Sequence, residues 1–284
     1  IGGGLFLFIY SGFVPLRKFG ASIKALGHKS DGEGQISSLQ ALMTTISSTV
    51  GMGNIAGVAI AICMGGPGAI FWMWVSALLG MATKFFEGTL AIMYRGRDET
   101  GNVKGGPMYM MTEGVSPKLR PLAVFFAFFA MIGCFCVMHA NQLTESITTV
   151  LTEPTGIATT MPVKLLIAGV MASLVAVVVV GGIDRISKLA TKIVPFMVVL
   201  FVAAGLGVIL LNIPQLPAAF ALIFKSAFSG TAAVGGFAGA AASAAIQNGI
   251  ARSVFSNEAG QGSSTMVHSQ AKVEHPVRQG MWGM

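Results

Sequence analysis

Charged residues are scarce in this chain. Only 10% of its 284 residues are Asp, Glu, Lys or Arg, whereas an ordinary soluble domain has about 25%. Residues 34–83, 193–224 and 226–251 contain no charge at all. A membrane-spanning helix needs roughly 20 apolar residues, and several stretches exceed that length. The composition therefore excludes an ordinary water-soluble domain and predicts an all-α polytopic membrane protein.

Cysteine is also rare. Cys63, Cys134 and Cys136 all lie inside apolar runs, which predicts buried free thiols. The pattern excludes a disulfide framework and a transition-metal site. We find neither a nucleophile nor a set of metal-ligating residues that would face a cavity, so we expect no enzyme activity and no cofactor.

The positive charges are unevenly placed. Of the 18 Lys and Arg residues, 15 fall in the loops after the first, third, fifth and seventh apolar segments. This is the positive-inside pattern, which places those loops in the cytoplasm and the start of the first segment outside the cell membrane. A sequence pI of about 9.5 therefore reflects membrane topology, and no nucleic-acid partner is expected.

About seven transmembrane segments are expected. A proline-bearing stretch, residues 213–229, is expected to form an interfacial helix, and the turn Gly65-Gly66-Pro67-Gly68 joins the second segment to the third. The chain begins at Ile1 inside an apolar run, and we expect it to be a C-terminally truncated fragment of a longer protein. The expected segments are residues 1–16, 38–64, 69–94, 121–151, 163–181, 191–211 and 232–255.

The second segment contains an unusual run of small and polar residues. Gly51, Gly53 and Asn54 are poor helix formers, and hydroxyl residues precede them. We therefore predict a transmembrane helix that is broken near Gly51–Asn54. A break at mid-membrane depth leaves backbone groups unpaired, which is tolerated where they line a cavity.

The predicted break offers two kinds of binding group. Free N–H groups at the start of the outer half, expected around Ile55 to Gly57, suit a carboxylate. Free carbonyls at the end of the inner half suit a small cation, as do nearby hydroxyls and the Asn54 amide. A zwitterionic small neutral amino acid and Na⁺ fit this arrangement. The expected cation ligands are Ser47, Thr49, Val50 and Asn54, and Gly51, Met52, Gly53 and Asn54 are expected to bind the substrate.

The seventh segment begins with a similar small-residue run, TAAVGGFAG at Thr231–Gly239. The two runs lie five segments apart and in opposite directions, which is typical of a five-plus-five inverted-repeat transporter. Residues 1–16 would be an extra N-terminal helix, 38–211 the first repeat and 232–284 the start of the second, within one transporter domain over 1–284. Gly235, Gly236, Phe237 and Ala241 are expected at the substrate site, with Phe237 as an apolar lid. Gly57 and Gly239 fit close helix packing equally well.

Other polar residues inside the segments have ordinary alternatives. Lys84 and Glu87 are three residues apart, which favours a structural ion pair. Gln142 is a further candidate for the substrate site, whereas His139 fits a packed or interfacial histidine better than a proton relay. The stretch Ser256–Ser263 is interpreted as an ordered cytoplasmic loop or gate.

Several long strings resemble the alanine/glycine:cation symporter family of bacteria and archaea. They include GMGNIAGVA at Gly51–Ala59, KGGPMYMM at Lys104–Met111, GGFAGAAASAAIQNGIAR at Gly235–Arg252 and FSNEAGQGS at Phe255–Ser263. Two others are GGPGAIFWMWVSALLGMATKFFEG at Gly65–Gly88 and HPVRQGMWGM at His275–Met284.

The resemblance implies a leucine-transporter-type fold and symport of alanine or glycine, usually with sodium. It also implies that backbone groups at Gly51–Asn54 hold the substrate carboxylate and that Asn54 helps to bind sodium. Carbonyls at Ser47 and Val50 would serve a second sodium ion, and Met52 stands where family members often have threonine. The alternatives from the residues are a proton-coupled or uncoupled facilitator, a channel, or a non-transport membrane subunit.

Overall fold

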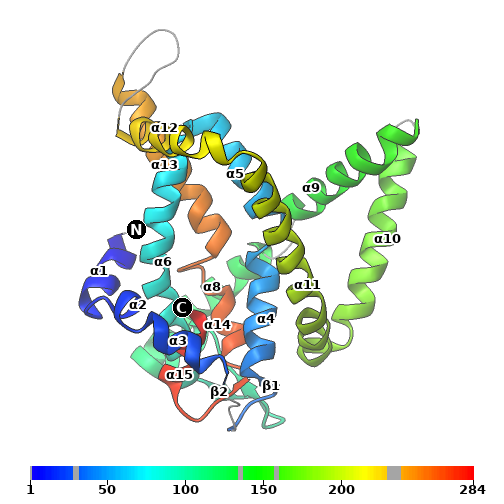
Figure 1. Ribbon diagram of the computed structural model, residues 1–284. Coiled ribbons are helices and arrows are strands. Elements are labelled where there is room, and N and C mark those ends of the chain that lie inside the picture. Colours follow the sequence, from blue (N-terminus) through cyan, green and yellow to red (C-terminus); the bar gives the residue numbers. More distant parts are fainter. Residues whose placement is uncertain (1, 28–31, 134–136, 157–159, 229–237) are drawn as a thin grey trace.

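The computed structural model describes residues 2–27, 32–133, 137–156, 160–228 and 238–284. Most of these residues lie in helices, and two short strand pairs lie together at one end of the molecule (Figure 1). The helices of the first half are α1 (Gly2–Tyr10), α2 (Val14–Arg17), α3 (Phe19–Ala25), α4 (Ser38–Thr49), α5 (Met52–Gly65), α6 (Gly68–Met93), α7 (Pro107–Tyr109), the π-helix η1 (Met110–Val115), the 3₁₀-helix η2 (Pro117–Leu119) and α8 (Arg120–Gly133).

The second half continues with α9 (Val137–Ile147), η3 (Thr148–Thr152), η4 (Glu153–Thr155), α10 (Met161–Val179), α11 (Gly182–Leu211), η5 (Ile213–Gln215), α12 (Leu216–Phe228), α13 (Ala238–Asn257), α14 (Ser263–His268) and α15 (Pro276–Gly283). The strands are β1 (Ile36–Ser37), β2 (Gly96–Arg97), β3 (Val103–Lys104) and β4 (Ala271–Lys272).

Four stretches of the described chain are long and apolar enough to cross a membrane. They are Ser38–Gly65, which runs through α4 and α5, then α6, α10 and α11. The segments expected at residues 38–64, 69–94 and 163–181 are thus confirmed as helical within a few residues. With large apolar side chains exposed along α10 and α11, the protein is a multi-pass membrane protein.

Three expected segments have a different form in the structure. Residues 1–16 form the short helices α1 and α2, and residues 121–151 form α8 and α9 on either side of undescribed residues 134–136. Helix α11 begins at Gly182, nine residues before the expected start, and Asp184 and Lys188 pair at 2.6 Å on its first turns. The total of seven spans stays a prediction.

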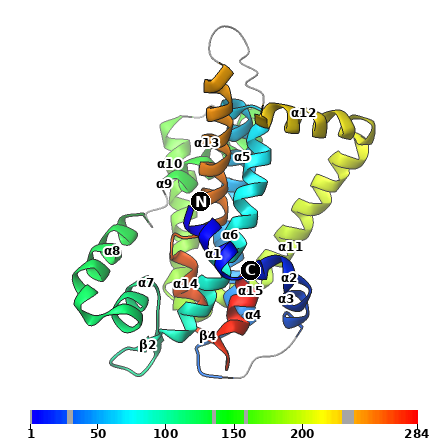
Figure 2. The ribbon, with the colours of Figure 1, turned by 90° about the vertical axis from the view of Figure 1, so that its left-hand side faces the viewer.

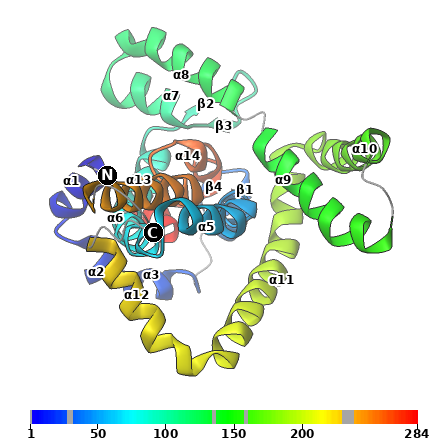
Figure 3. The same ribbon diagram turned by 90° about the horizontal axis from the view of Figure 1, so that it is seen from above.

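Helix α6 is the centre of the packing. It contacts α1, α5, α12, α13, α14 and α15. Figure 3 shows α1, α5, α13 and α14 around it, with α7–α8 and α9–α10 to the sides. Small residues allow the close approach: a Cβ atom on Gly88 would lie 2.9 Å from the Gln279 carbonyl oxygen. This agrees with the general use of glycine at membrane helix contacts.

The turn between α5 and α6 has the expected position. Helix α5 ends at Gly65, Gly66 has a φ of 73°, and α6 begins at Gly68. Helix α12, preceded by η5, lies across the same end of the molecule (Figure 2), which agrees with the helix expected over residues 213–229.

The cysteine prediction is confirmed in one respect and wrong in another. Cys63, near the end of α5, is a free thiol, but its side chain is exposed rather than buried. An apolar run suits a membrane-facing surface as well as a protein interior, so it did not imply burial inside the protein. Cys134 and Cys136 lie outside the described residues.

The opposite end of the molecule is closed by strands. β1 pairs in parallel with β4, and β2 pairs with β3 in an antiparallel hairpin. Ile36 and Ala271 from the parallel pair are fully buried together with Val273. The Arg95 Nη1 atom donates to the carbonyl oxygens of Glu33 and Ala271, at 2.9 and 3.2 Å. Arg95, just after the end of α6, is thereby tied to β4 and to the segment that precedes β1.

Candidate functional site

The helix that begins at Ser38 is interrupted at the expected place. A capping box at Ser37 and Gln40 starts α4, which ends at Thr49. Val50 and Gly51 are extended, with Gly51 at φ −161° and ψ −151°, and α5 begins at Met52. The free N–H groups at the start of α5 are therefore those near Met52 and Gly53, one turn earlier than the expected Ile55–Gly57.

Asn54 links the two sides of the interruption. Its Nδ2 atom donates to the Thr49 carbonyl oxygen at 3.0 Å, and its backbone N–H donates to the Gly51 carbonyl oxygen at 3.0 Å. Its Oδ1 atom accepts a hydrogen bond from Ser256 Oγ on α13. Asn54 thus connects the end of α4, the start of α5 and a helix about two hundred residues later in the chain.

The expected cation ligands lie together at the end of α4. Ser47 Oγ donates to the Thr44 carbonyl oxygen at 2.6 Å, and Thr49 Oγ1 donates to the Thr45 carbonyl oxygen at 3.1 Å. The Val50 N–H donates to the Ile46 carbonyl oxygen at 2.7 Å. A hydroxyl that donates back into the helix still has acceptor lone pairs. Of the last carbonyl oxygens, that of Ile46 already accepts from the Val50 N–H and that of Thr49 from Asn54 Nδ2.

The remaining expected substrate residues are less well placed. Gly235, Gly236 and Phe237 lie outside the described residues, and Ala241 lies on α13 without a described side chain. Gln142 is half-buried on α9, a helix that contacts α5. Its backbone carbonyl oxygen accepts a hydrogen bond from Ser146 Oγ at 2.9 Å. The described contacts do not bring the Gln142 side chain to Asn54.

A second interruption was not expected as part of the site. Helix α13 ends at Asn257, and α14 begins at Ser263. The intervening loop has positive φ angles at Glu258 (52°), Gly260 (88°) and Gly262 (84°). The glycine-rich string EAGQG was the available signal, but it fits an ordinary loop equally well.

This loop lies beside the α4–α5 interruption. Ser256 Oγ, in the last turn of α13, bonds Asn54, and Ser48 Oγ lies 3.5 Å from Glu258 Oε2. The two interruptions therefore form one site, although more than two hundred residues separate them in the chain.

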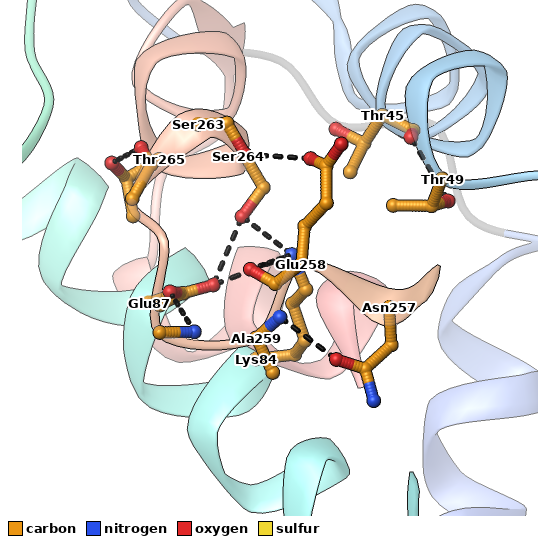
Figure 4. Close-up of polar contacts among 12 residues, drawn as sticks. Thr45, Thr49, Lys84, Glu87, Asn257, Glu258, Ala259, Ser263, Ser264 and Thr265 are labelled. Atoms are coloured by element: carbon orange, nitrogen blue, oxygen red, sulfur yellow. Dashed lines mark hydrogen bonds and ion pairs between the residues drawn. The ribbon is translucent and has the colours of Figure 1, made fainter. Parts of the chain in front are cut away.

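Lys84 and Glu87 form the expected ion pair and also hold this loop (Figure 4). Their charged atoms lie 3.4 Å apart, and the side chains are 10% and 11% exposed. Lys84 Nζ donates to Ser264 Oγ at 2.9 Å and to the Glu258 carbonyl oxygen at 3.3 Å. Glu87 accepts from Ser264 Oγ and from the Gly260 N–H, at 2.9 and 2.8 Å.

A cavity of about 270 Å³ lies next to the interruption. Among its lining residues, Thr45 and Thr49 come from α4, Lys84 from α6, Asn257 from the end of α13 and His268 from α14. No cluster of three metal-ligating side chains occurs in the described part of the chain.

His268 is the buried titratable group of this cavity. It is 1% exposed, and burial, with a smaller effect of the Lys84 charge, lowers its pKa to about 4. A neutral His268 at pH 7 fits the contact between Gln279 Nε2 and His268 Nδ1 at 2.6 Å.

Taken together, the site combines opposed helix ends with hydroxyl and amide groups. The start of α5 presents N–H groups, which attract an anionic group, and the end of α4 presents carbonyl oxygens, which attract a cation. Such a pair of ends can bind a zwitterion and a small cation side by side.

Comparison with known proteins also points to a transporter. Residues 1–284 match the model of the sodium:alanine symporter family. The chain is 42% identical over its whole length to the sodium/alanine symporter AgcS of Methanococcus maripaludis, and it covers 62% of that protein. It is 41% identical over its whole length to the uncharacterized transporter YflA of Bacillus subtilis, covering 59% of it.

A third relative is the amino-acid carrier protein AlsT of Bacillus subtilis, which is 38% identical over 99% of the chain and is covered to 57%. The chain thus spans roughly 60% of the length of the curated relatives it matches. These relatives are transporters rather than enzymes. Since the family model matches every residue, the chain belongs to the sodium:alanine symporter family.

Proposed function

We propose that the protein containing this chain is a sodium-coupled symporter of a small neutral amino acid, alanine or glycine, that works by alternating access in the cell membrane. The observation that carries the proposal is the interruption at Val50–Gly51, where the ends of α4 and α5 face each other across two extended residues. Family membership supports it, and AgcS is by name a sodium/alanine symporter.

In this proposal the substrate carboxylate binds the N–H groups at the start of α5, around Gly51, Met52 and Gly53. The sodium ion binds the carbonyl and hydroxyl oxygens at the end of α4, with Asn54 beside it. Sodium would stabilise the substrate-competent arrangement, and by linkage the substrate would raise the affinity for sodium equally. Gln142, Gly235, Gly236, Phe237 and Ala241 remain proposed substrate contacts.

The proposed architecture is a leucine-transporter-like five-plus-five inverted repeat, with residues 1–16 as an extra helix. What supports it is that the interrupted segment α4–α5 packs against α13, which follows the second small-residue run expected from the sequence. The second break expected from the sequence, around residues 235–236, lies outside the described residues.

The proposed orientation places the strand pairs in the cytoplasm. In Figure 1 the helices α2 and α3, both strand pairs and the junction of α10 with α11 lie at one end, and α12 lies at the other. The loops after the first, third and fifth segments therefore share an end, which supports the orientation expected from their Lys and Arg content.

The test is uptake of radiolabelled alanine by proteoliposomes that contain the full-length protein, with and without an inward sodium gradient. We expect accumulation above equilibrium that collapses when sodium is equilibrated. Uptake that only equilibrates would identify a facilitator or channel, and accumulation driven by a proton gradient alone would identify proton coupling. Unlabelled glycine, serine and glutamine, added as competitors of increasing size, would define the substrate.

A further inference from the structure

The loop between α13 and α14 brings a carboxylate to the end of α4. Glu258 Oε2 accepts a hydrogen bond from Ser263 Oγ at 2.6 Å and lies 3.5 Å from Ser48 Oγ, in the last turn of α4. Figure 4 shows the Glu258 side chain extending from the loop toward the helix that carries Thr45 and Thr49. The carboxylate is therefore held between two helices that are far apart in the chain.

The backbone at Glu258 has an uncommon conformation. Its φ of 52° is left-handed, and the other non-glycine residue with a positive φ among the described residues is Phe13. Left-handed backbone disfavours Glu relative to Gly or Asn. The Lys84 Nζ bond to the Glu258 carbonyl oxygen and the Glu87 bond to the Gly260 N–H hold the loop in this shape. The loop thus presents a carboxylate at a position where a glycine would be less strained.

Groups of both signs lie near this carboxylate. It faces the C-terminal end of α4, where the helix dipole places partial negative charge. Lys84 lies near, but its ion pair is with Glu87. Glu258 takes part in none of the four ion pairs Lys84–Glu87, Arg97–Glu33, Lys104–Asp98 and Lys188–Asp184 of the described chain.

We propose that Glu258 is the anionic ligand of a sodium ion bound between the end of α4 and the α13–α14 loop, with Ser48 and Ser263 as neighbouring oxygen ligands. Carboxylate, hydroxyl and carbonyl oxygens are the ligands that hard cations prefer. This inference rests on the proposed sodium coupling, and it adds a charged residue to a set of otherwise neutral ligands. It also explains how sodium would join the two interrupted helices, because its ligands come from both.

The experiment measures the sodium dependence of the full-length protein carrying Glu258→Gln. Half-saturating sodium is measured for alanine uptake in proteoliposomes and for thermal stabilisation of the purified protein, with choline replacing sodium at constant ionic strength. We expect a rise of about tenfold or more in both values, the scale on which loss of a supporting group weakens metal binding. The matched control is Glu99→Gln, which removes the same charge from the exposed β2–β3 hairpin and should leave both values unchanged.

A second pair of variants separates charge from folding. Asp and Asn are similar in size and both tolerate left-handed backbone, so Glu258→Asp and Glu258→Asn should fold alike. We expect the Asp variant to keep a sodium response and the Asn variant to lose it. Equal sodium responses in this pair, or a Gln variant within twofold of the unmodified protein, would overturn the assignment.

Two outcomes separate this inference from the function on which it rests. If the Gln variant keeps its sodium affinity but loses a pH dependence of uptake, Glu258 binds a proton and the sodium assignment is wrong, while symport stands. If the unmodified protein accumulates alanine without any effect of sodium in either assay, sodium coupling fails and the Glu258 site fails with it.

Discussion

Asn54 is the side chain that joins the two interrupted segments, since it bonds Thr49 and Ser256. We predict that Asn54→Ala raises the sodium concentration for half-maximal alanine uptake by roughly tenfold, because two hydrogen bonds of about 1 kcal/mol each are lost at the cation site. Sodium titration of uptake in proteoliposomes measures the change. Asn212→Ala is the control, since Asn212 bonds only within its own turn at Val208. Unchanged sodium activation would count strongly against the assigned site.

The lowered pKa of His268 predicts a pH dependence of the protein's stability. Its pKa is lowered from 6.5 to about 4 in the folded protein, so the unfolded chain binds the proton more readily. The contribution of His268 to the free energy of unfolding should be fully present above pH 6.5 and should be lost as the pH drops from 6.5 to 4, by a total on the order of 3 kcal/mol. Thermal unfolding of the purified full-length protein across this range measures it.

His268→Gln should flatten that profile between pH 6.5 and 4, whereas His275→Gln should leave it unchanged because His275 is exposed. A profile with the same slope in the His268 variant would show that another group carries the effect. The other charged groups near His268 are Lys84 and Glu87 on α6, which contacts α14.

At the scale of elements, the Lys84–Glu87 pair fastens the α13–α14 loop to α6. We predict that Lys84→Met destabilises the protein by about 3 kcal/mol, because it leaves the Glu87 carboxylate buried without its partner. Lys188→Met breaks the exposed pair with Asp184, whose side chains are 63% and 60% exposed, and should cost less than about 1 kcal/mol. Thermal unfolding of both variants in the same detergent measures the two losses of stability. Equal losses of stability would contradict the structural role of Lys84.

The sequence predicts those elements whose signals are local. Gly51, Gly53 and Asn54 are poor helix formers close together, and the interruption lies there. Lys84 and Glu87 are about one helical turn apart, and they pair. The contact between Ser256 and Asn54 has no local signal, because nothing in either string states which glycine-rich stretch packs beside the first interruption. For the same reason the sequence predicts an ordered cytoplasmic loop or gate around Glu258 and does not say which element it contacts.

At the scale of the whole molecule, the orientation in the membrane can be tested directly. With Cys63, Cys134 and Cys136 replaced, a cysteine at Thr100 in the β2–β3 hairpin should react with a membrane-impermeant maleimide only after the cells are lysed. A cysteine at Asn212, at the end of α11, should react in intact cells. The reverse pattern would invert the proposed topology.

The parallel pair of β1 and β4 also bears on how the protein is made. Ser38 Oγ donates to the Lys272 carbonyl oxygen at 3.3 Å, and the two residues are 234 positions apart in the chain. At roughly 5–20 residues per second, a ribosome needs about 12–47 s to synthesise the chain between them. During that interval the first interrupted helix is already within reach of the translocon but has no partner at its inner end. The inner end of the first interrupted segment therefore waits for its strand partner during this interval in every newly made copy.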